Sequence, residues 1–196
     1  LVGKGTVHAS LDHLYALIKF AVDEKVDPDK LFIHAFTDGR DSFSKDSVDV
    51  LDEIETFCLR KRMGRIASII GRAYAMDRNR NWKRTKIAYD LLTKAEGKII
   101  KNWKKEILDS YTKNITDEYL EPICVVFKDE NPVIVSENDS VIFYNFRPDR
   151  AVQLTMAFED ESFKGFQRDL IQNLYFVGMT DYEKGFPKRQ AFPPEV

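Results

Sequence analysis

The sequence predicts an α/β fold, a three-layer α/β/α sandwich built on a mostly parallel central sheet. Short apolar runs rich in β-forming residues alternate with longer segments whose apolar residues recur at helical spacing. Such an alternation requires crossover connections, which make neighbouring strands parallel and place helices on both faces of the sheet. The chain has 196 residues, of which 43% are hydrophobic, enough for one domain with a substantial core. No internal linker divides it.

The first half of the chain contains two strands and two helices. Apolar residues recur at helical spacing over 11–22, and Pro28 disfavours helix shortly after that segment. Residues 31–36 form a short apolar run, which predicts a buried strand. A helix is predicted over 44–62, and a second buried strand over 65–70.

The second half continues the alternation with shorter elements. The predicted helices cover 82–94, 98–111 and 150–158. The predicted strands cover 123–127, 141–146 and 174–179. Residues 1–2 also resemble the end of a strand. When this strand is included, helices separate most of the predicted strands, as a three-layer sandwich requires.

Composition excludes several functional classes. Thirty basic residues are balanced by 32 acidic ones, which gives a net charge of -2 and argues against a nucleic-acid partner. No apolar run approaches the roughly 18 residues that span a bilayer, so no membrane partner is expected. The two cysteines, Cys58 and Cys124, are too few for a disulfide scaffold or a Cys-rich zinc module. They are expected to be reduced core thiols in a cytoplasmic protein.

The two ends of the chain suggest a piece of a longer protein. The sequence has no initiator Met and opens on Leu1, and residues 192–196 read as a Pro-containing linker. We therefore expect further chain outside these 196 residues.

Arginines gather at the predicted carboxyl ends of the strands, where ligands bind in folds of this type. Overall charge is balanced, so the gathering is local. A guanidinium group offers a planar fork that matches carboxylate and phosphate oxygens. The cluster therefore predicts a small, multiply anionic metabolite as ligand. Its members are Arg40, Arg72, Arg78, Arg147 and Arg150.

The strongest local argument for an anion comes from the segment 147–150. Pro148 and Asp149 are typical of the first turn of a helix. Arg147 and Arg150 lie three residues apart, so their side chains can be neighbours at that helix start. Two cations at a helix N-terminus are unfavourable, and an anion between them would remove the conflict.

Other groups near these loops could handle a proton or a hydroxyl. Asp41, next to Arg40, could accept a hydroxyl hydrogen bond or act as an acid/base, although an Asp-Gly turn with a local ion pair explains the same residues. His8 follows a Gly-containing segment, 3–7, that is either an anion-binding loop or a plain turn. His13 and His34 are expected to be structural. Neither metal-ligand spacing nor a GxSxG elbow occurs, so the site suits holding a substrate rather than attacking it.

Four motifs in order resemble cofactor-independent (2,3-bisphosphoglycerate-independent) phosphoglycerate mutase: HAFTDGRD, IASIIGRAYAMDRNRNWKRTKIAYD, VIFYNFRPDRAVQL and VGMTDYEKGF. The resemblance runs through nearly the whole chain and covers the substrate-binding, phosphotransferase-type domain of that family. It implies that 1–196 is a single domain of a two-domain enzyme. The other domain, alkaline-phosphatase-like, carries a serine that becomes phosphorylated and two metal ions, usually manganese.

The resemblance also implies an activity, the interconversion of 3-phosphoglycerate and 2-phosphoglycerate in glycolysis. The isolated chain, a monomer without its own metal or cofactor, would bind phosphoglycerate but not turn it over. Because they occupy matching positions in the family's motifs, Asp41 and His8 are implied to be the catalytic residues. The substrate contacts implied are His8, Arg40, Asp41, Arg72, Arg78, Arg147 and Arg150.

The sequence departs from the family pattern at Ser42-Phe43, where the family tends to have Thr-Pro-Pro after GRD, and mainly at the N-terminus. Where the family reads similar to SDGGVHSH, this chain has GKGTVHAS at 3–10, so that Gly3 and Lys4 replace Ser-Asp and Ser10 replaces the second His. The extra cation, Lys4, keeps an alternative open. In that alternative the chain is a non-catalytic, small-anion-binding or regulatory module derived from the family.

Overall fold

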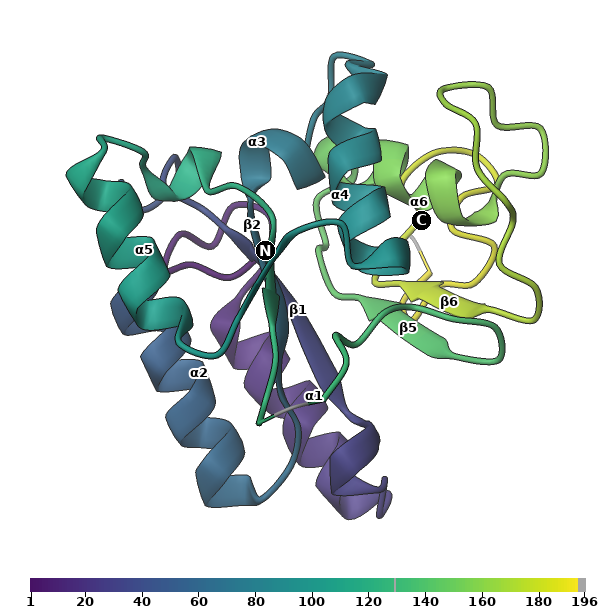
Figure 1. Ribbon diagram of the computed structural model, residues 1–196. Helices are drawn as coiled ribbons and strands as arrows, with labels where there is room; N and C mark the ends of the chain where they lie inside the picture. Colours follow the sequence, from purple (N-terminus) through teal and green to yellow (C-terminus); the bar gives the residue numbers. More distant parts are fainter. Residues whose placement is uncertain (129, 194–196) are drawn as a thin grey trace.

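A four-stranded sheet runs through the computed structural model, which describes residues 1–128 and 130–193 (Figure 1). Its strand order is β1-β2-β4-β3, and a separate pair, β5-β6, lies beside it. The β1/β2, β3/β4 and β5/β6 ladders are parallel and β2/β4 is antiparallel, so the sheets are mostly parallel as predicted. The strands are β1 Phe32–Thr37, β2 Arg65–Gly71, β3 Lys98–Ile100, β4 Ile123–Val125, β5 Ser140–Phe143 and β6 Tyr175–Gly178.

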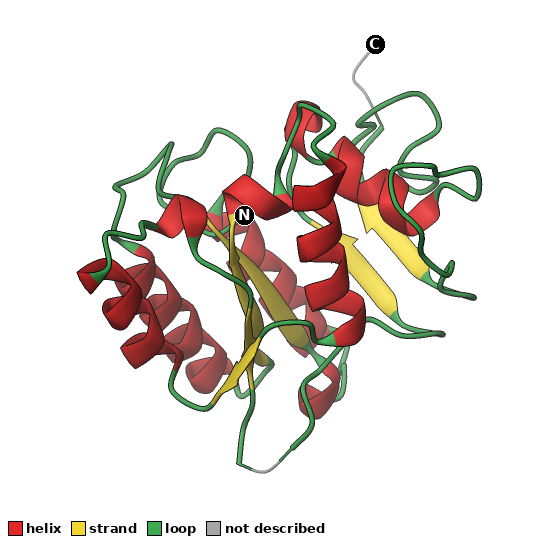
Figure 2. Cartoon of the chain, turned by 45° about the horizontal axis from the view of Figure 1, so that its top comes forward, coloured by secondary structure: helices red, strands yellow, loops and turns green. Residues whose placement is uncertain are grey.

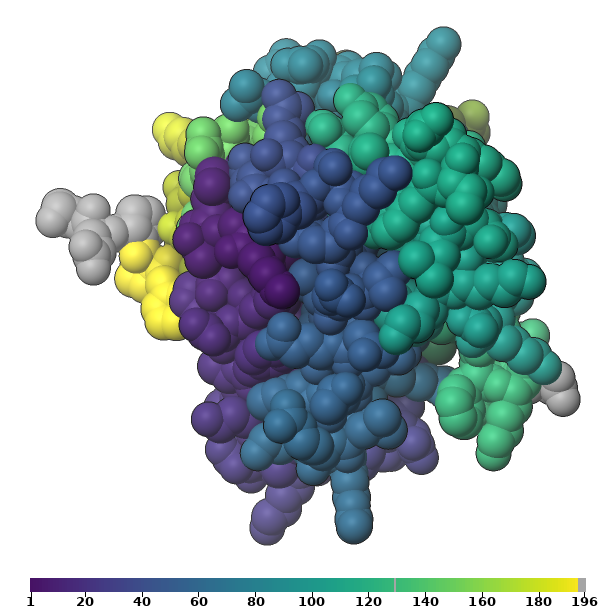
Figure 3. Space-filling model, turned by 90° about the vertical axis from the view of Figure 1, so that its left-hand side faces the viewer, coloured from purple at the N-terminus to yellow at the C-terminus, as the bar shows by residue number. Residues whose placement is uncertain are grey.

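Helices cover both faces of the sheet, which confirms the predicted α/β/α layers (Figures 1 and 2). One layer contains α1 (Leu11–Asp23), α2 (Ser47–Lys61) and α5 (Trp103–Thr112). Figure 3 shows this side of the molecule, where the segment around α2 lies between the N-terminal segment and the segment around α5. The opposite layer contains α3 (Arg72–Ala75), α4 (Trp82–Lys94) and α6 (Val152–Glu159).

Two apolar cores form because the strands are apolar on both faces. In the first, Ile54 of α2 and Ile107 of α5 pack with Ile69 of β2. In the second, Leu91 of α4 and Phe158 of α6 are buried with Ile70, the next residue of β2. Alternate residues of a strand point to opposite faces, so β2 contributes to both cores. Fully burying each such side chain is worth about 1.5–3 kcal/mol.

The predicted helix over 98–111 is partly wrong. Residues 98–100 form the edge strand β3, which pairs in parallel with β4, and the helix α5 begins only at Trp103. The Asn102 side chain caps it by accepting a hydrogen bond from Lys105 N at 3.0 Å. Two consecutive isoleucines, Ile99 and Ile100, suit a strand better than a helix start.

Other predicted boundaries shift by a few residues. The strand end expected at residues 1–2 is a single parallel bridge between Val2 and Thr37. The helix expected from residue 44 begins at Ser47, where the distant Asp117 carboxylate accepts hydrogen bonds from the backbone N–H groups of Asp46 and Ser47 at 2.8 and 2.9 Å. That aspartate lies in a short 3₁₀ turn, Asp117–Tyr119; a further 3₁₀ turn is Pro28–Lys30.

The strand predicted over 141–146 ends at Phe143, and the helix predicted from residue 150 begins at Val152. Between them lies a 3₁₀ turn, Pro148–Arg150. Phe146 N donates to His8 O at 2.8 Å, so the exit of β5 is tied to the N-terminal loop rather than to β6. The strands predicted over 123–127 and 174–179 end early, at Val125 and Gly178.

Three simpler expectations concern the cysteines, the membrane and the end of the chain. Cys58 and Cys124 are buried free thiols, as predicted. Within 1–128 and 130–193, no helix is both long and apolar enough to cross a bilayer. The end of the expected linker, 194–196, lies outside the described residues.

Candidate anion-binding site

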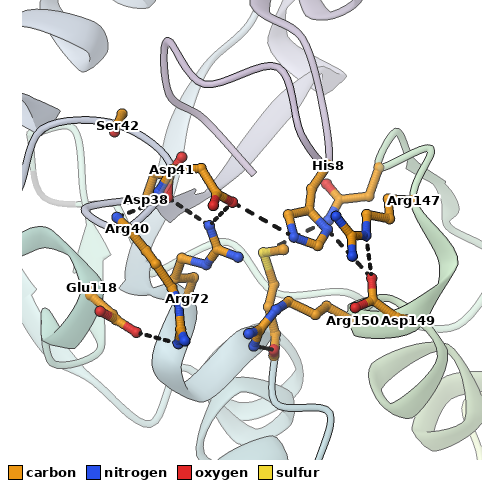
Figure 4. A network of polar contacts seen from close by, with 12 residues as sticks. His8, Asp38, Arg40, Asp41, Ser42, Arg72, Glu118, Arg147, Asp149 and Arg150 are labelled. Carbon is orange, nitrogen blue, oxygen red and sulfur yellow. Dashed lines mark hydrogen bonds and ion pairs between the residues drawn. The ribbon is translucent and has the colours of Figure 1, made fainter.

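The loops that follow β1, β2 and β5 converge with the N-terminal loop (Figure 4). The predicted site residues lie on these loops, except Arg78, which follows α3 and pairs with Asp149 of the loop after β5. Arg40 and Asp41 follow β1, and Arg72 opens α3 directly after β2. Arg147 and Arg150 belong to the 3₁₀ turn region after β5. His8, in the loop before α1, lies between Asp41 on one side and Arg147 on the other. The topology therefore brings together residues that are far apart in sequence.

Arg72 is the centre of the cluster. It is 1% exposed, and its Nη1 donates to Asp38 Oδ1 and to Asp41 Oδ2, both at 2.6 Å. Burial alone would lower the pKa of Arg72, but the two carboxylates outweigh it and raise that pKa. Arg72 therefore stays charged although it is enclosed.

Asp38 fixes the loop that carries the predicted pair. Its Oδ1 also accepts the backbone N–H groups of Arg40 and Asp41 at 3.1 and 3.0 Å. Gly39 makes the turn possible, because its φ of +68° suits glycine and an added Cβ would lie 2.6 Å from Glu118 N. The Asp-Gly turn considered from the sequence is thus present, whereas the ion pairs of this loop are not local: Arg40 pairs with Glu118 and Asp41 with Arg72.

His8 is a buried imidazole between two carboxylates. Its Nε2 lies 3.7 Å from Asp41 Oδ2, and its Nδ1 lies 3.8 Å from Asp149 Oδ1. Burial, followed by the positive charge of Arg72, lowers the pKa of His8 to about 4. The ring is therefore neutral near pH 7, with one nitrogen that carries a hydrogen and one with a free lone pair.

We expect the His8 ring of the folded chain to titrate at about pH 4. An unfolded histidine titrates at about 6.5, so the unfolded chain takes up the proton first as the pH falls. His8 therefore reduces folding stability progressively below about pH 6.5. A ¹H–¹³C NMR titration measures the ring directly, and His8→Gln should lose less stability than the wild type between about pH 7 and about pH 5. A ring that titrates near its ordinary value would contradict this expectation.

Asp41 and Asp149 are both ionised partners of arginines. Partial burial would raise the pKa of Asp41, but the hydrogen bond and charge of Arg72 reverse that effect and lower it. For Asp149, burial is likewise outweighed by the hydrogen bond from Arg78 and the charge of Arg147, so its pKa is also lowered. In the ligand-free site, each carboxylate can accept a proton or a hydrogen bond but has none to give.

Arg147 and Arg150 do not lie at the start of an α-helix, which corrects that part of the sequence-based expectation. They flank a 3₁₀ turn, and Arg147 Nε donates to Asp149 Oδ1 at 3.0 Å. Arg150 Nη1 turns away and donates to Met76 O at 3.0 Å. The anion that pairs with Arg147 is Asp149 of the same turn, which the sequence had suggested only as a helix-start residue.

A polar cavity of about 130 Å³ lies beside Arg72. Four of the predicted arginines line it, together with one that the sequence analysis did not select: Arg40, Arg72, Arg78, Arg150 and Arg84. Burial and the charges of Arg72, Arg78 and Arg40 lower the pKa of Arg150, so positive charge is in local excess there. This excess of positive charge, with Asp77 and Glu118 as the acidic residues of the lining, favours an anion in the cavity.

A larger cavity lies elsewhere and lacks this character. It measures about 330 Å³ and lies beside Tyr74, Lys98 and Glu106. Lys98, the cation of that wall, is already paired with Glu106 at 2.6 Å. The smaller cavity is therefore the better candidate for an anionic ligand.

Buried residues that the sequence analysis missed hold the loop that carries Arg78. Asp77 Oδ2 accepts the backbone N–H groups of Asn79 and Asn81 at 3.0 and 2.8 Å, and Gln153 Nε2 at 3.0 Å. Gln153 Oε1 accepts Arg80 N at 2.7 Å. Because Gln153 belongs to α6, this network fastens the Arg78 loop to the helix that follows Arg150. In the sequence, Asp77 and Gln153 are marked only by their places within the MDR and FRPDRAVQ segments.

Glu118 was also missed, and the sheet topology explains why it lies at the site. It accepts a hydrogen bond from Arg40 Nη1 at 3.2 Å and borders the cavity. Since β4 is antiparallel to β2, the segment that precedes β4 lies at the edge where β2 ends. A sequence that predicts parallel strands offers no signal for this placement.

The glycines of the N-terminal loop are explained by packing. A Cβ on Gly5 would lie 2.4 Å from Asp41 O, so the loop runs directly against the segment 38–41. The plain-turn interpretation accounts for this glycine without a ligand. The neighbouring Lys4 is exposed.

The other two histidines have the structural surroundings that were predicted. His34 Nδ1 lies 2.7 Å from Ser68 Oγ on the adjacent strand. His13 places its ring edge-on to Phe146, with centroids 5.6 Å apart. Among residues 1–128 and 130–193, no group of three or more His, Cys, Asp or Glu side chains is arranged to hold a metal ion.

Comparison with known proteins agrees with the motifs. Residues 1–184 match the family model described as BPG-independent PGAM N-terminus. The chain is 45% identical to the 2,3-bisphosphoglycerate-independent phosphoglycerate mutase of Moorella thermoacetica, covering all of this chain (100%) and 38% of that protein. It is 43% identical to mutase 2 of Methanosarcina acetivorans, covering 100% of this chain and 37% of that protein.

A solved structure has the same fold. The phosphoglycerate mutase of Leishmania mexicana, crystallised at low cobalt concentration, superposes with a TM-score of 0.91 and 29% identity, over 98% of this chain and 37% of that one. The chain thus spans somewhat more than a third of the length of these relatives. Because the family model matches residues 1–184 and these relatives match over the whole of this chain, the chain belongs to the 2,3-bisphosphoglycerate-independent phosphoglycerate mutase family and corresponds to its N-terminal domain model.

Proposed function

We propose that this chain is the substrate-binding domain of a phosphoglycerate mutase that interconverts 3-phosphoglycerate and 2-phosphoglycerate in glycolysis. In this proposal residues 1–196 form one domain of a two-domain enzyme. The second, alkaline-phosphatase-like domain supplies the serine that becomes phosphorylated and two manganese ions. The relatives that cover the whole chain are named as mutases of this type, which supports the proposal.

The arginine-lined cavity is the observation that carries the proposal. Phosphoglycerate has an anionic carboxylate at one end and an anionic phosphoryl group near the other. Arginine forks match both groups, and the cavity places several of them around one space. The lowered pKa of Arg150 has burial as its main cause, followed by the charges of neighbouring arginines, and this cationic surplus would be neutralised by such a ligand.

The residues of the site would divide the work by their chemistry. The substrate-binding arginines would hold carboxylate and phosphoryl oxygens and stabilise the charge that develops in phosphoryl transfer. Asp41, kept ionised by Arg72, would accept a hydrogen bond from a glycerate hydroxyl and receive its proton. His8, neutral near pH 7 and 3.7 Å from Asp41, would hold or return a proton at its Nε2.

Metal chemistry belongs to the second domain in this proposal. The described residues of this chain do not offer a ligand set for manganese, and none of the roles above depends on a metal. The free thiols Cys58 and Cys124 fit a reducing compartment such as the cytoplasm. We further propose a monomer, with neither nucleic acid nor membrane as partner.

The alternative is a non-catalytic module that binds small anions. The departure at Gly3 and Lys4 favours it, because it adds an exposed cation to a loop where the family has Ser-Asp. The parent protein distinguishes the two functions. A flanking domain with an intact serine and metal ligands supports the mutase, and a parent without them supports the alternative.

We expect 3-phosphoglycerate to bind the 196-residue chain without turnover. Backbone ¹⁵N NMR shifts should move around Arg40, Arg72 and Arg147 during a millimolar titration, and much less in Arg78→Ala, whose half-exposed side chain can be removed without opening the core. A parallel assay should find mutase activity in the full-length protein and none in the isolated chain. Turnover by the chain alone, or a full-length protein that binds but never isomerises phosphoglycerate, would refute the proposal.

A further inference from the structure

Asp149 lies against three of the predicted site residues. The helix-start role predicted for it does not explain these contacts. Its Oδ2 accepts a hydrogen bond from Arg78 Nη1 at 3.0 Å, and its Oδ1 accepts one from Arg147 Nε at 3.0 Å. Oδ1 also lies 3.8 Å from His8 Nδ1 (Figure 4). The carboxylate thus joins three segments of the chain: the loop after α3, the turn after β5, and the N-terminal loop.

The two arginine contacts leave the rest of each guanidinium group available. Arg147 uses Nε, so both of its Nη groups remain outside this ion pair. Arg78 uses Nη1, so its Nε and Nη2 remain outside it. A ligand oxygen could therefore be bound by both arginines while Asp149 keeps its place. This geometry suits a permanent support better than a group that the ligand must displace.

The two arginines need a group that orders them, because their long side chains have many rotamers and their positive charges repel each other. Their side chains are 48% and 47% exposed, so packing does little to hold them. A free arginine samples many rotamers, and ordering it on binding costs affinity. Asp149 offsets the repulsion and removes much of that freedom before a ligand arrives.

We propose that Asp149 is a positioning residue that holds Arg78 and Arg147 in the arrangement that receives the substrate. The proposal rests on the proposed function for its kinetic consequence, but its binding consequence is independent of turnover. It assigns a role to the aspartate inside the FRPDR motif, which the sequence analysis had interpreted as a helix-start residue.

The sign of the effect of Asp149→Asn on phosphate binding distinguishes this role from simple electrostatics. Removing a negative charge beside a cationic site should, by charge alone, tighten binding of an anion. Removing a support should weaken it, because the arginines are no longer ordered. Inorganic phosphate, titrated into the 196-residue chain and followed by calorimetry, is the probe. We expect Asp149→Asn to weaken phosphate binding and Asp149→Glu to recover part of it. Asp109→Asn, an exposed aspartate on α5, should change nothing.

The full-length enzyme provides the second readout. Asp149→Asn should lower kcat/KM by about 10- to 100-fold, mainly through a higher KM, with an unchanged melting temperature. Tighter phosphate binding or a lower KM in Asp149→Asn would show a competing internal anion and overturn the proposal, as would no change in either measurement. A wild-type enzyme without mutase activity would refute the proposed function alone, because the phosphate titration would still decide the role of Asp149.

Discussion

Arg72→Met is expected to lower the free energy of unfolding by about 3 to 5 kcal/mol, the usual cost of removing one partner from a buried ion pair. Arg72 and Asp38 are each 1% exposed, and the distance between Arg72 Nη1 and Asp38 Oδ1 is 2.6 Å. Methionine fills much of the same volume but leaves the Asp38 carboxylate without its counter-charge. Asp41 loses the same partner, although it is better able to reach water.

Arg65→Met is the matched control, because Arg65 forms an ion pair of similar length at the surface. Its Nη2 lies 2.6 Å from Glu130 Oε2, and both side chains are well exposed. Such a pair contributes about 0–1 kcal/mol. Urea unfolding of both variants at neutral pH measures the difference. Equal losses would mean that the buried arrangement of Arg72 contributes no more than a surface contact does.

Asp38→Asn in the Arg72→Met background tests the cause of that loss. If the cost comes from an uncompensated buried carboxylate, neutralising Asp38 should restore part of the stability. The asparagine Oδ1 can still accept the N–H groups of Arg40 and Asp41, so the loop keeps its local hydrogen bonds. A double variant no more stable than Arg72→Met would point instead to lost packing.

The main elements of the fold could be predicted because their patterns are local. The helix predicted over 82–94 has the observed bounds of α4, and β1 and β2 lie where apolar runs placed them. The failures are non-local. Residues 98–100 are too short a run to show a period, and they become a strand only because the edge of β4 is available. The direction of β4 likewise depends on its partner, since an isolated strand sequence does not encode whether its ladder is parallel.

The same division applies to the candidate site. Its arginines and Asp41 could be selected because they lie in segments that follow apolar strands, where an open α/β sheet binds ligands. Glu118 could not, because it reaches the site through the antiparallel direction of β4. Gln153 could not, because its role depends on a hydrogen bond across to Asp77.

The carboxylates of the site were the harder part to interpret from sequence. From the local cations in the sequence we infer an anionic ligand. The charges alone do not show which groups offset the repulsion between those cations in the folded chain. In the structure Asp38 and Asp149 do so, each inside a motif selected for its arginines. An anion site built from arginines needs its own anions, because unpaired guanidinium groups would repel one another before the ligand arrives.

Arg147→Ala in the full-length enzyme is expected to lower kcat/KM by about 100-fold or more, the usual cost of losing one donor that stabilises developing charge. The fold should survive, because the Arg147 side chain is 47% exposed and contributes only an ion pair within its own turn. Steady-state kinetics with 3-phosphoglycerate, together with a melting curve, measure both effects. Arg60→Ala, a change to an exposed arginine on α2, is the control and should leave kcat/KM unchanged.

Combining Arg147→Ala with Asp149→Asn shows whether the two residues act together. If Asp149 works partly by holding Arg147, its substitution has less left to disturb once Arg147 is gone, and the two losses in kcat/KM will not add. The remaining effect of Asp149→Asn would then come from Arg78, the other arginine that it binds. Wild-type kinetics in Arg147→Ala would remove Arg147 from the substrate contacts. Fully additive losses would show that Asp149 does not act through it.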